Sequence, residues 1–179
     1  LTDLSHPCQI FADIMTIEEW SGDISGKTIA WLGDGNNVCT SLMHAAEKLD
    51  FKLRIATPAS YAPRGQELAA AKAAGADIEA HNDAKKAAEG ADVIVTDTWV
   101  SMGDTDKAER MAAFPPFAVD DAMMQRANKD AVFLHCLPAH RGEEVTDSVL
   151  DGPQSAAWDE AENRIHAQKA VLLWCLGKL

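Results

Sequence analysis

The chain has 179 residues and a mass of 19.3 kDa, enough for one ordinary hydrophobic core, and its 28 acidic against 16 basic residues give a formal net charge of −12. A field of this sign repels phosphate groups, so we expect neither nucleic acid nor an anionic membrane as a partner. No apolar run approaches the roughly 20 residues of a membrane span, and the first residues lack the regions typical of a secretion signal, so we expect a cytoplasmic protein.

Short apolar runs rich in Val, Ile and Leu, bounded by Gly, Asp or Pro, have the composition of buried parallel strands. They span residues 27–32, 52–57, 77–81, 92–96 and 131–135. Residues 37–49 repeat apolar side chains in steps of three and four, and the alanine-rich residues 66–74 stop at Gly75, so both predict helices. This alternation predicts a doubly wound, Rossmann-like α/β domain with a parallel sheet of about five strands and helices on both faces.

The two ends and one internal segment lie outside this repeat. Residues 9–20 and 158–177 predict helices, and residues 170–176 are apolar all round, which favours a helix covered on more than one side. We expect residues 103–116 to form a mobile loop and a short helix able to close over a ligand. We expect residues 1–179 to be a single domain, and the start at Leu1 instead of Met suggests a piece of a longer protein.

The cysteines are scattered along the chain, at Cys8, Cys39, Cys136 and Cys175. They show neither the dense framework of a small secreted domain nor the paired spacing of a zinc site, so we expect free thiols. Cys39 and Cys175 fall within predicted helices among apolar neighbours, so we expect both in the core. Residue types that bind metals occur at His6, Cys8, His135, Cys136 and His140. Their spacing matches no closed zinc site, and we expect no metal.

The stretch Gly33-Asp34-Gly35-Asn36-Asn37 follows the first predicted strand and is comparable with the glycine loop of dinucleotide-binding folds. Val38 takes the place of the third glycine, and the second strand ends in Thr57 and Pro58 where an acidic ribose ligand would be expected. We therefore expect no dinucleotide. The amides of Asn36 and Asn37 can cap the next helix or bind a carboxylate or amine.

Polar residues also follow two other predicted strands. Asp97 comes directly after an apolar strand and suits an ammonium group, although a lone aspartate there is more often a turn former. The fifth strand ends in His135 and Cys136, and neighbours on an extended segment point to opposite faces, which counts against a cysteine–histidine nucleophile pair. Because ligands of open α/β sheets bind at the carboxyl ends of strands, we expect these strand ends to form one site.

Two further motifs lie on the terminal helices. His6, Pro7, Cys8 and Gln9 mark a helix start, with Pro7 at or near its first position. The motif is either a cap or a place where His6 and Gln9, aided by the helix dipole, polarise a carbonyl or hold an anion. Arg164 is either one half of a solvated ion pair or a bidentate anion ligand.

Taken together, these motifs resemble the ornithine carbamoyltransferase family in identity, order and spacing, over essentially the whole chain. They are His6-Pro7-Cys8-Gln9, residues 33–37, residues 97–103 with Ser101-Met102-Gly103, His135-Cys136-Leu137-Pro138, and residues 160–164. The loop at 97–103 is the motif specific to the ornithine-using branch. The family's amino-terminal half, with the Ser-Thr-Arg-Thr-type loop that holds phosphate, is not in the sequence. The chain therefore resembles the ornithine-binding domain alone.

The resemblance implies transfer of the carbamoyl group of carbamoyl phosphate to L-ornithine, without a cofactor, by a homo-oligomeric parent enzyme, a trimer, in a reaction of the arginine-biosynthesis or urea-cycle type. It implies ornithine contacts at Asn37, Asp97, Ser101 and Met102. It implies carbamoyl phosphate contacts at His6, Pro7, Cys8, Gln9, Cys136, Leu137 and Arg164. Cys136 would also be catalytic, orienting or deprotonating the reacting amine.

Two alternatives remain open: a transcarbamoylase for another amine or amino acid, such as putrescine, and a non-catalytic amino-acid-binding module. The loop at 97–103 argues against a diamine, which has no α-carboxylate to recognise. For the chain alone we expect folding without catalysis.

Overall fold

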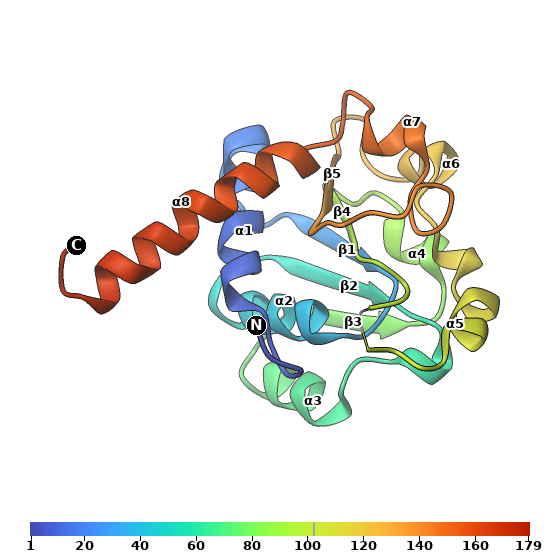
Figure 1. The fold of residues 1–179 in the computed structure, drawn as a ribbon, viewed down its shortest axis with the longest axis horizontal. Coiled ribbons are helices and arrows are strands. Elements are labelled where there is room, and N and C mark those ends of the chain that lie inside the picture. The colour runs from blue at the N-terminus through green and yellow to red at the C-terminus, as the bar shows by residue number, and fades with distance from the viewer. Residues whose placement is uncertain (102) are drawn as a thin grey trace.

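The computed structural model describes residues 1–101 and 103–179. It contains a parallel sheet in the order β3-β2-β1-β4-β5 (Figure 1). The strands are β1 (Thr28–Leu32), β2 (Lys52–Ala56), β3 (Ile78–His81), β4 (Val93–Thr96) and β5 (Val132–His135). Each lies within its predicted run, one residue shorter. The strand order reverses between β1 and β4, which is the arrangement of Rossmann-like folds.

Helices cover both faces of the sheet, as predicted. Ile29 and Trp31 of β1 are buried in one core, and the helices of that core are α1 (Pro7–Ser21), α2 (Asn37–Lys48) and α3 (Gly65–Ala73). Ala30 and Leu32 are buried in the other core, whose helices include α4 (Ala84–Ala88), α6 (Asp121–Met124) and α7 (Asp147–Leu150). Successive β1 residues thus alternate between the cores, and the doubly wound fold is confirmed.

The short helices of the second face were not predicted. Each spans four or five residues, too few for a periodic apolar pattern to be visible. The local signals of α4 and α6 are aspartate caps: the Asp83 side chain accepts from the Lys86 amide at 3.1 Å, and that of Asp120 from the Met123 amide at 2.8 Å. The short helix expected within residues 103–116 is present as α5 (Lys107–Ala113), followed by a 3-10 turn at Pro115–Phe117.

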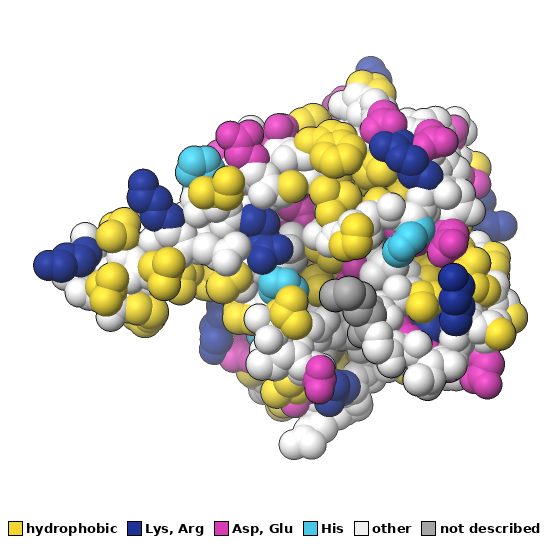
Figure 2. All heavy atoms as spheres, viewed as in Figure 1, with side chains coloured by type: hydrophobic (Ala, Val, Ile, Leu, Met, Phe, Trp, Pro, Cys, Tyr) yellow, Lys and Arg dark blue, Asp and Glu magenta, His cyan; other side chains and the backbone are white. Residues whose placement is uncertain are grey.

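The last helix, α8 (Ala157–Cys175), packs on α1 through its first half and projects beyond the body through its second (Figure 1). Leu172, Trp174 and Leu176 are 63%, 72% and 70% exposed. Cys39 is buried as predicted, but Cys175 is exposed, so its assignment to the core is wrong. The reason is that α8 is longer than the surface on which it packs. Apolar side chains are exposed along its projecting second half (Figure 2). Within residues 1–101 and 103–179, no helix is both long and apolar enough to cross a bilayer.

Candidate functional site

The polar strand ends meet at the carboxyl edge of the sheet, where β1, β4 and β5 lie side by side. Asp97 follows β4 and Cys136 follows β5, and each offers an atom within 4.8 Å of the other and of a His135 ring nitrogen. Asp97 is 7% exposed. The structure thus brings Asp97 and Cys136 together, as expected, and the switch point between β1 and β4 lies beside them.

Asn36 ties the end of β1 to this cluster. Its Oδ1 accepts from the amides of Val38 and Cys39, at 2.9 and 3.1 Å, which caps α2. Its Nδ2 donates to Asp97 Oδ2 at 2.7 Å, and Asp97 Oδ1 accepts from the Thr98 amide at 2.7 Å. A carboxylate oxygen has two lone pairs, so both oxygens of Asp97 keep capacity for an ammonium ligand.

The other residues expected to contact ornithine are placed differently. Asn37 opens α2, and its Nδ2 donates to the carbonyl of Thr2 at 2.7 Å instead of to Asp97. Ser101 is exposed, and its amide donates to Asp104 Oδ2 at 2.7 Å. Met102 lies outside the described residues. The structure therefore brings Asn36 against Asp97, while the Asn37 side chain binds the backbone of Thr2 and the Ser101 amide binds the side chain of Asp104.

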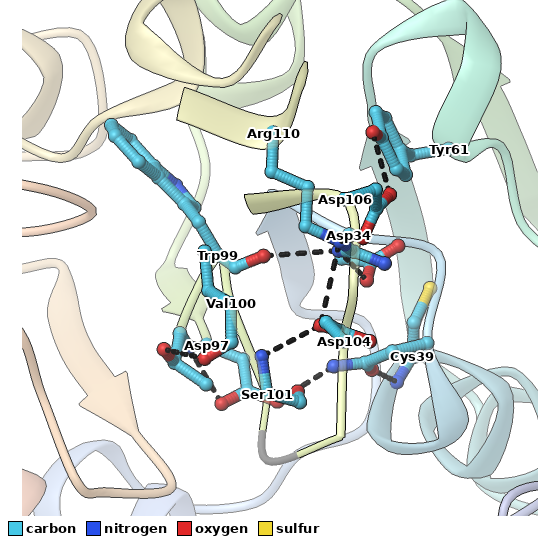
Figure 3. A network of polar contacts seen from close by, with 12 residues as sticks. Asp34, Cys39, Tyr61, Asp97, Trp99, Val100, Ser101, Asp104, Asp106 and Arg110 are labelled. Carbon is cyan, nitrogen blue, oxygen red and sulfur yellow. Dashed lines mark hydrogen bonds and ion pairs between the residues drawn. The ribbon is translucent and has the colours of Figure 1, made fainter. Parts of the chain in front are cut away.

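Arg110 of α5 fastens the loop that carries Ser101 (Figure 3). Its guanidinium contacts Asp34 at 2.7 Å, Asp106 at 2.9 Å, the carbonyl of Trp99 at 3.0 Å and Asp104 at 3.4 Å. It also lies over the ring of Tyr61, 4.6 Å from the centroid. Burial raises the pKa of Asp34, an effect that Arg110 opposes. Both ends of the loop are thus held to the end of β1.

Glycine is required at position 35 for a steric reason that does not involve a nucleotide. A Cβ at this position would lie 2.3 Å from the nitrogen of Pro63 and 2.5 Å from the carbonyl carbon of Ala62. The segment after β2 crosses so closely that only glycine fits. Gly35 therefore serves close packing, and Gly33 serves the turn through its positive φ of 142°.

His135 is occupied on both ring nitrogens. Nδ1 accepts from the Leu137 amide at 2.9 Å, so Nε2 carries the proton and donates to Glu144 Oε1 at 3.1 Å. The ring is completely buried. His135 therefore shapes the turn, in which Leu137 has a positive φ of 50°, and both ring nitrogens are already bonded within the protein.

Cys136 is a neutral thiol in this environment. Burial, followed by the neighbouring Asp97 carboxylate, raises the pKa of the Cys136 thiol well above its ordinary value. A protonated thiol can orient a ligand but cannot accept its proton, so of the two expected roles only orientation fits the structure. The His135 ring is bonded to Glu144 through Nε2 and to the Leu137 amide through Nδ1, and to the Cys136 sulfur through neither.

The start of α1 presents His6 as its N-cap residue. The His6 amide donates to Ser41 Oγ at 2.7 Å, and Pro7 is the first residue of α1, as predicted. Cys8 is half-buried. Among the described residues, His6 Nδ1 is buried and has no hydrogen-bond partner. Burial and then the positive charge of Arg164 lower the pKa of His6, so the imidazole is neutral near pH 7.

Gln9 is fixed by two buried acids. Its Nε2 donates to Asp13 Oδ1 at 2.8 Å and to Glu160 Oε1 at 2.7 Å, and its Oε1 accepts from Arg164. Both N–H bonds are therefore used within the protein. The expected contact from the Gln9 N–H to a carbonyl or anion is not available, and Gln9 offers a ligand only its oxygen.

Arg164 is half-buried and, in the part of the chain that the structure describes, has no carboxylate within ion-pairing distance. Its Nε is buried without a partner there. The solvated ion pair is thus not observed. A guanidinium with free donors beside a neutral imidazole suits an anionic or strongly polar ligand.

Comparisons with known proteins agree with this geometry. Residues 25–175 match the family model described as "Aspartate/ornithine carbamoyltransferase, Asp/Orn binding domain". The ornithine carbamoyltransferase of Caulobacter vibrioides is 63% identical over 179 residues, which is 100% of this chain and 58% of that protein. The ornithine carbamoyltransferase of Rhizorhabdus wittichii is 59% identical with the same coverage. The chain thus spans 58% of the length of these relatives.

Solved structures show the same likeness. An ornithine carbamoyltransferase from Pyrococcus furiosus superposes with a TM-score of 0.89 at 50% identity, over 96% of this chain and 56% of that one. The anabolic ornithine carbamoyltransferase from Campylobacter jejuni gives a TM-score of 0.93 at 37% identity, over 100% of this chain and 61% of that one. The α/β architecture is therefore shared with enzymes of known structure.

Proposed function

The chain belongs to the aspartate/ornithine carbamoyltransferase family, and on that premise we propose that it is the ornithine-binding part of an ornithine carbamoyltransferase. The reaction converts carbamoyl phosphate and L-ornithine to L-citrulline and phosphate. The observation that carries the proposal is the buried Asp97 carboxylate, held by Asn36 at the switch point beside Cys136. Residues 1–179 would form one domain, with the phosphate held mainly by a further, amino-terminal domain.

Asp97 receives the α-ammonium of ornithine in this proposal. A carboxylate already fixed by two N–H donors loses little freedom when a third arrives, which favours binding. Asn37, Ser101 and Met102 complete the contacts to the α-carbon end, as the family resemblance implies. Cys136, a neutral thiol beside Asp97, orients the chain of the substrate so that its unprotonated δ-amine faces the carbamoyl carbon.

The carbamoyl end lies against α1 and α8. Gln9 Oε1 accepts from the carbamoyl –NH2, because its oxygen is the only part of the amide left for a ligand. His6 and Arg164 donate toward the carbonyl and phosphate oxygens, where negative charge grows as the new C–N bond forms and the C–O bond to phosphate breaks. Pro7, Cys8 and Leu137 supply backbone around this end. Holding both substrates in line can itself supply on the order of 7 to 11 kcal/mol in favourable models.

The proposed enzyme works in the cytoplasm as a homo-oligomer, a trimer by family resemblance, without a cofactor. The charge of −12 supports the absence of nucleic acid and membrane partners. Light scattering of the assembled enzyme tests the trimer.

The decisive experiment joins the chain to the amino-terminal segment of the Caulobacter relative that it does not cover, hereafter the fusion protein. We expect the fusion protein to form citrulline from ornithine, and the 179-residue chain alone to form none. Putrescine and aspartate are the matched substrates, because they distinguish an ornithine enzyme from its siblings. Preference for either of them, or ligand binding without any turnover, would contradict the proposal.

A further inference from the structure

Asp13 of α1 and Glu160 of α8 are both 1% exposed and lie within hydrogen-bonding reach of each other. The two acids converge on one amide group, that of Gln9. Glu160 has a second task, because its Oε2 accepts from the His135 amide at 2.8 Å, at the end of β5. Three elements of the site, α1, α8 and β5, are thus joined through a single buried carboxyl group.

Two buried carboxyl groups in contact do not both ionise, because like charges in a poorly solvated place repel strongly. Burial raises the pKa of Asp13 to about 6, and burial together with Asp13 raises the pKa of Glu160 well above its ordinary value. The pair therefore keeps one proton near neutral pH. A protonated carboxyl oxygen can donate to its neighbour and still accept from Gln9, which an amide –NH2 group cannot do.

We propose that Asp13 and Glu160 are positioning residues that fix the orientation of the Gln9 amide, so that its oxygen and not its –NH2 group is presented beside Arg164 to the carbamoyl group. The inference rests on the proposed function for the identity of the ligand. A reversed amide would place two N–H donors against the donors of Arg164 and leave the acids with a carbonyl oxygen. Both changes are unfavourable, so the acids hold the orientation that receives a carbamoyl –NH2.

The geometry predicts that replacement of the carboxyl group by an amide is tolerated at Asp13 but not at Glu160. In Asp13→Asn, the new amide can accept from Gln9 through its oxygen and donate to Glu160 through its nitrogen, so every bond is kept. In Glu160→Gln, one end of the new amide is an –NH2 group, while the His135 amide and Gln9 Nε2 both require an acceptor. One donor must then face another, or the Gln9 amide must turn over. The two variants each remove one carboxyl group and change the volume little, so they form a matched pair.

The test measures steady-state kinetics of the fusion protein and of both variants. For Glu160→Gln we expect the KM for carbamoyl phosphate to rise about tenfold or more, with the KM for ornithine changed less than twofold. For Asp13→Asn we expect both constants within about threefold of the unmodified protein. Equal losses in the two variants, or an unchanged carbamoyl phosphate KM in folded Glu160→Gln, would overturn the assignment.

A second measurement covers the case in which Glu160→Gln does not fold. NMR of the unmodified 179-residue chain reports hydrogen exchange of the Gln9 side-chain amide, with the exposed Gln66 as internal reference. We expect Gln9 to exchange at least about a hundredfold more slowly, since both of its N–H bonds are buried and bonded. Exchange at the rate of Gln66 would refute the positioning role. If the unmodified fusion protein forms no citrulline, the proposed function fails, and the exchange rate still decides the orientation of Gln9.

Discussion

Asn36 and Asp97 are joined by a hydrogen bond of 2.7 Å that crosses from the end of β1 to the end of β4. Because Oδ1 of Asn36 caps α2, its –NH2 group has to point at Asp97. The start of a helix and the carboxylate proposed to bind the substrate ammonium are therefore parts of one unit. Asn36 thus positions Asp97 as well as stabilising α2.

Asp97→Asn in the fusion protein should weaken ornithine binding by roughly 10- to 150-fold, because a charge-assisted hydrogen bond in a desolvated place is worth about 1.5 to 3 kcal/mol. Carbamoyl phosphate binding should change far less. Isothermal titration with each substrate makes the comparison. Equal losses for both substrates would contradict the role given to Asp97.

Asn36→Ala should cost about 1 to 3 kcal/mol in the free energy of unfolding, because it removes a helix cap and takes away the donor to Asp97 Oδ2. It should also raise the ornithine KM. Asp83→Ala is the matched control, since it removes the cap of α4, remote from the site, with a similar loss of stability. If both variants raise the ornithine KM equally, Asn36 affects ornithine binding only through the stability of the fold and does not position Asp97.

Cys136 should react slowly with iodoacetamide at pH 7.5, because its raised pKa keeps the thiol protonated. Exposed Cys175 serves as the reference for reagent quality in the same sample. Asp97→Asn should accelerate the reaction of Cys136, since it removes a negative charge that raises the thiol pKa. Mass spectrometry of peptides from a time course measures both rates; rapid labelling of Cys136 in the unmodified chain would exclude a neutral thiol.

Cys136→Ala should lower turnover without unfolding the protein.

Arg110→Ala should destabilise the chain by about 3 kcal/mol, because it leaves the largely buried Asp34 carboxylate without its partner. It should also release the loop at 99–106, which limited proteolysis detects. Arg141→Ala is the control: its ion pairs with Asp147 and Asp151 are exposed to solvent, so their loss should destabilise the chain much less than the loss of Arg110. Similar losses in the two variants would show that Arg110 does not fasten the loop.

Asp13→Asn should become more stable relative to the unmodified chain as the pH rises from about 4 to about 7. The pKa of Asp13 is 3.8 when the group is free and about 6 in the folded chain, so folding is favoured by the protonated form and this contribution is lost between those values. The expected gain for the variant is on the order of 1 to 3 kcal/mol. Urea unfolding at pH 4.5 and 7.5 measures it, and a gain that shrinks with rising pH would reverse the sign of the argument.

The sequence predicted the strands to within one residue because buried parallel strands are continuous apolar runs with sharp polar ends. The start of α1 at Pro7 was equally visible. Asp13 was missed, although its spacing of four from Gln9 places both on one helix face and a polar stripe there was a usable signal. Arg110 left no such signal, because its partners are separated along the chain and only the fold brings them together.

The distal part of α8 has a different local stability from the proximal part. Ala157, Glu160, Asn163 and Ala167 are buried, but none of residues 168–175 is. The amides of the distal turns are therefore held only by their own helix, and a short helix without tertiary contacts is marginal in water. These turns will open by fraying, whereas the turns that carry Glu160 open only when the core does. A surface that packs against the distal turns of α8 would stop this fraying. Slower hydrogen exchange of the amides in residues 168–175 would therefore detect such packing, one helical turn at a time.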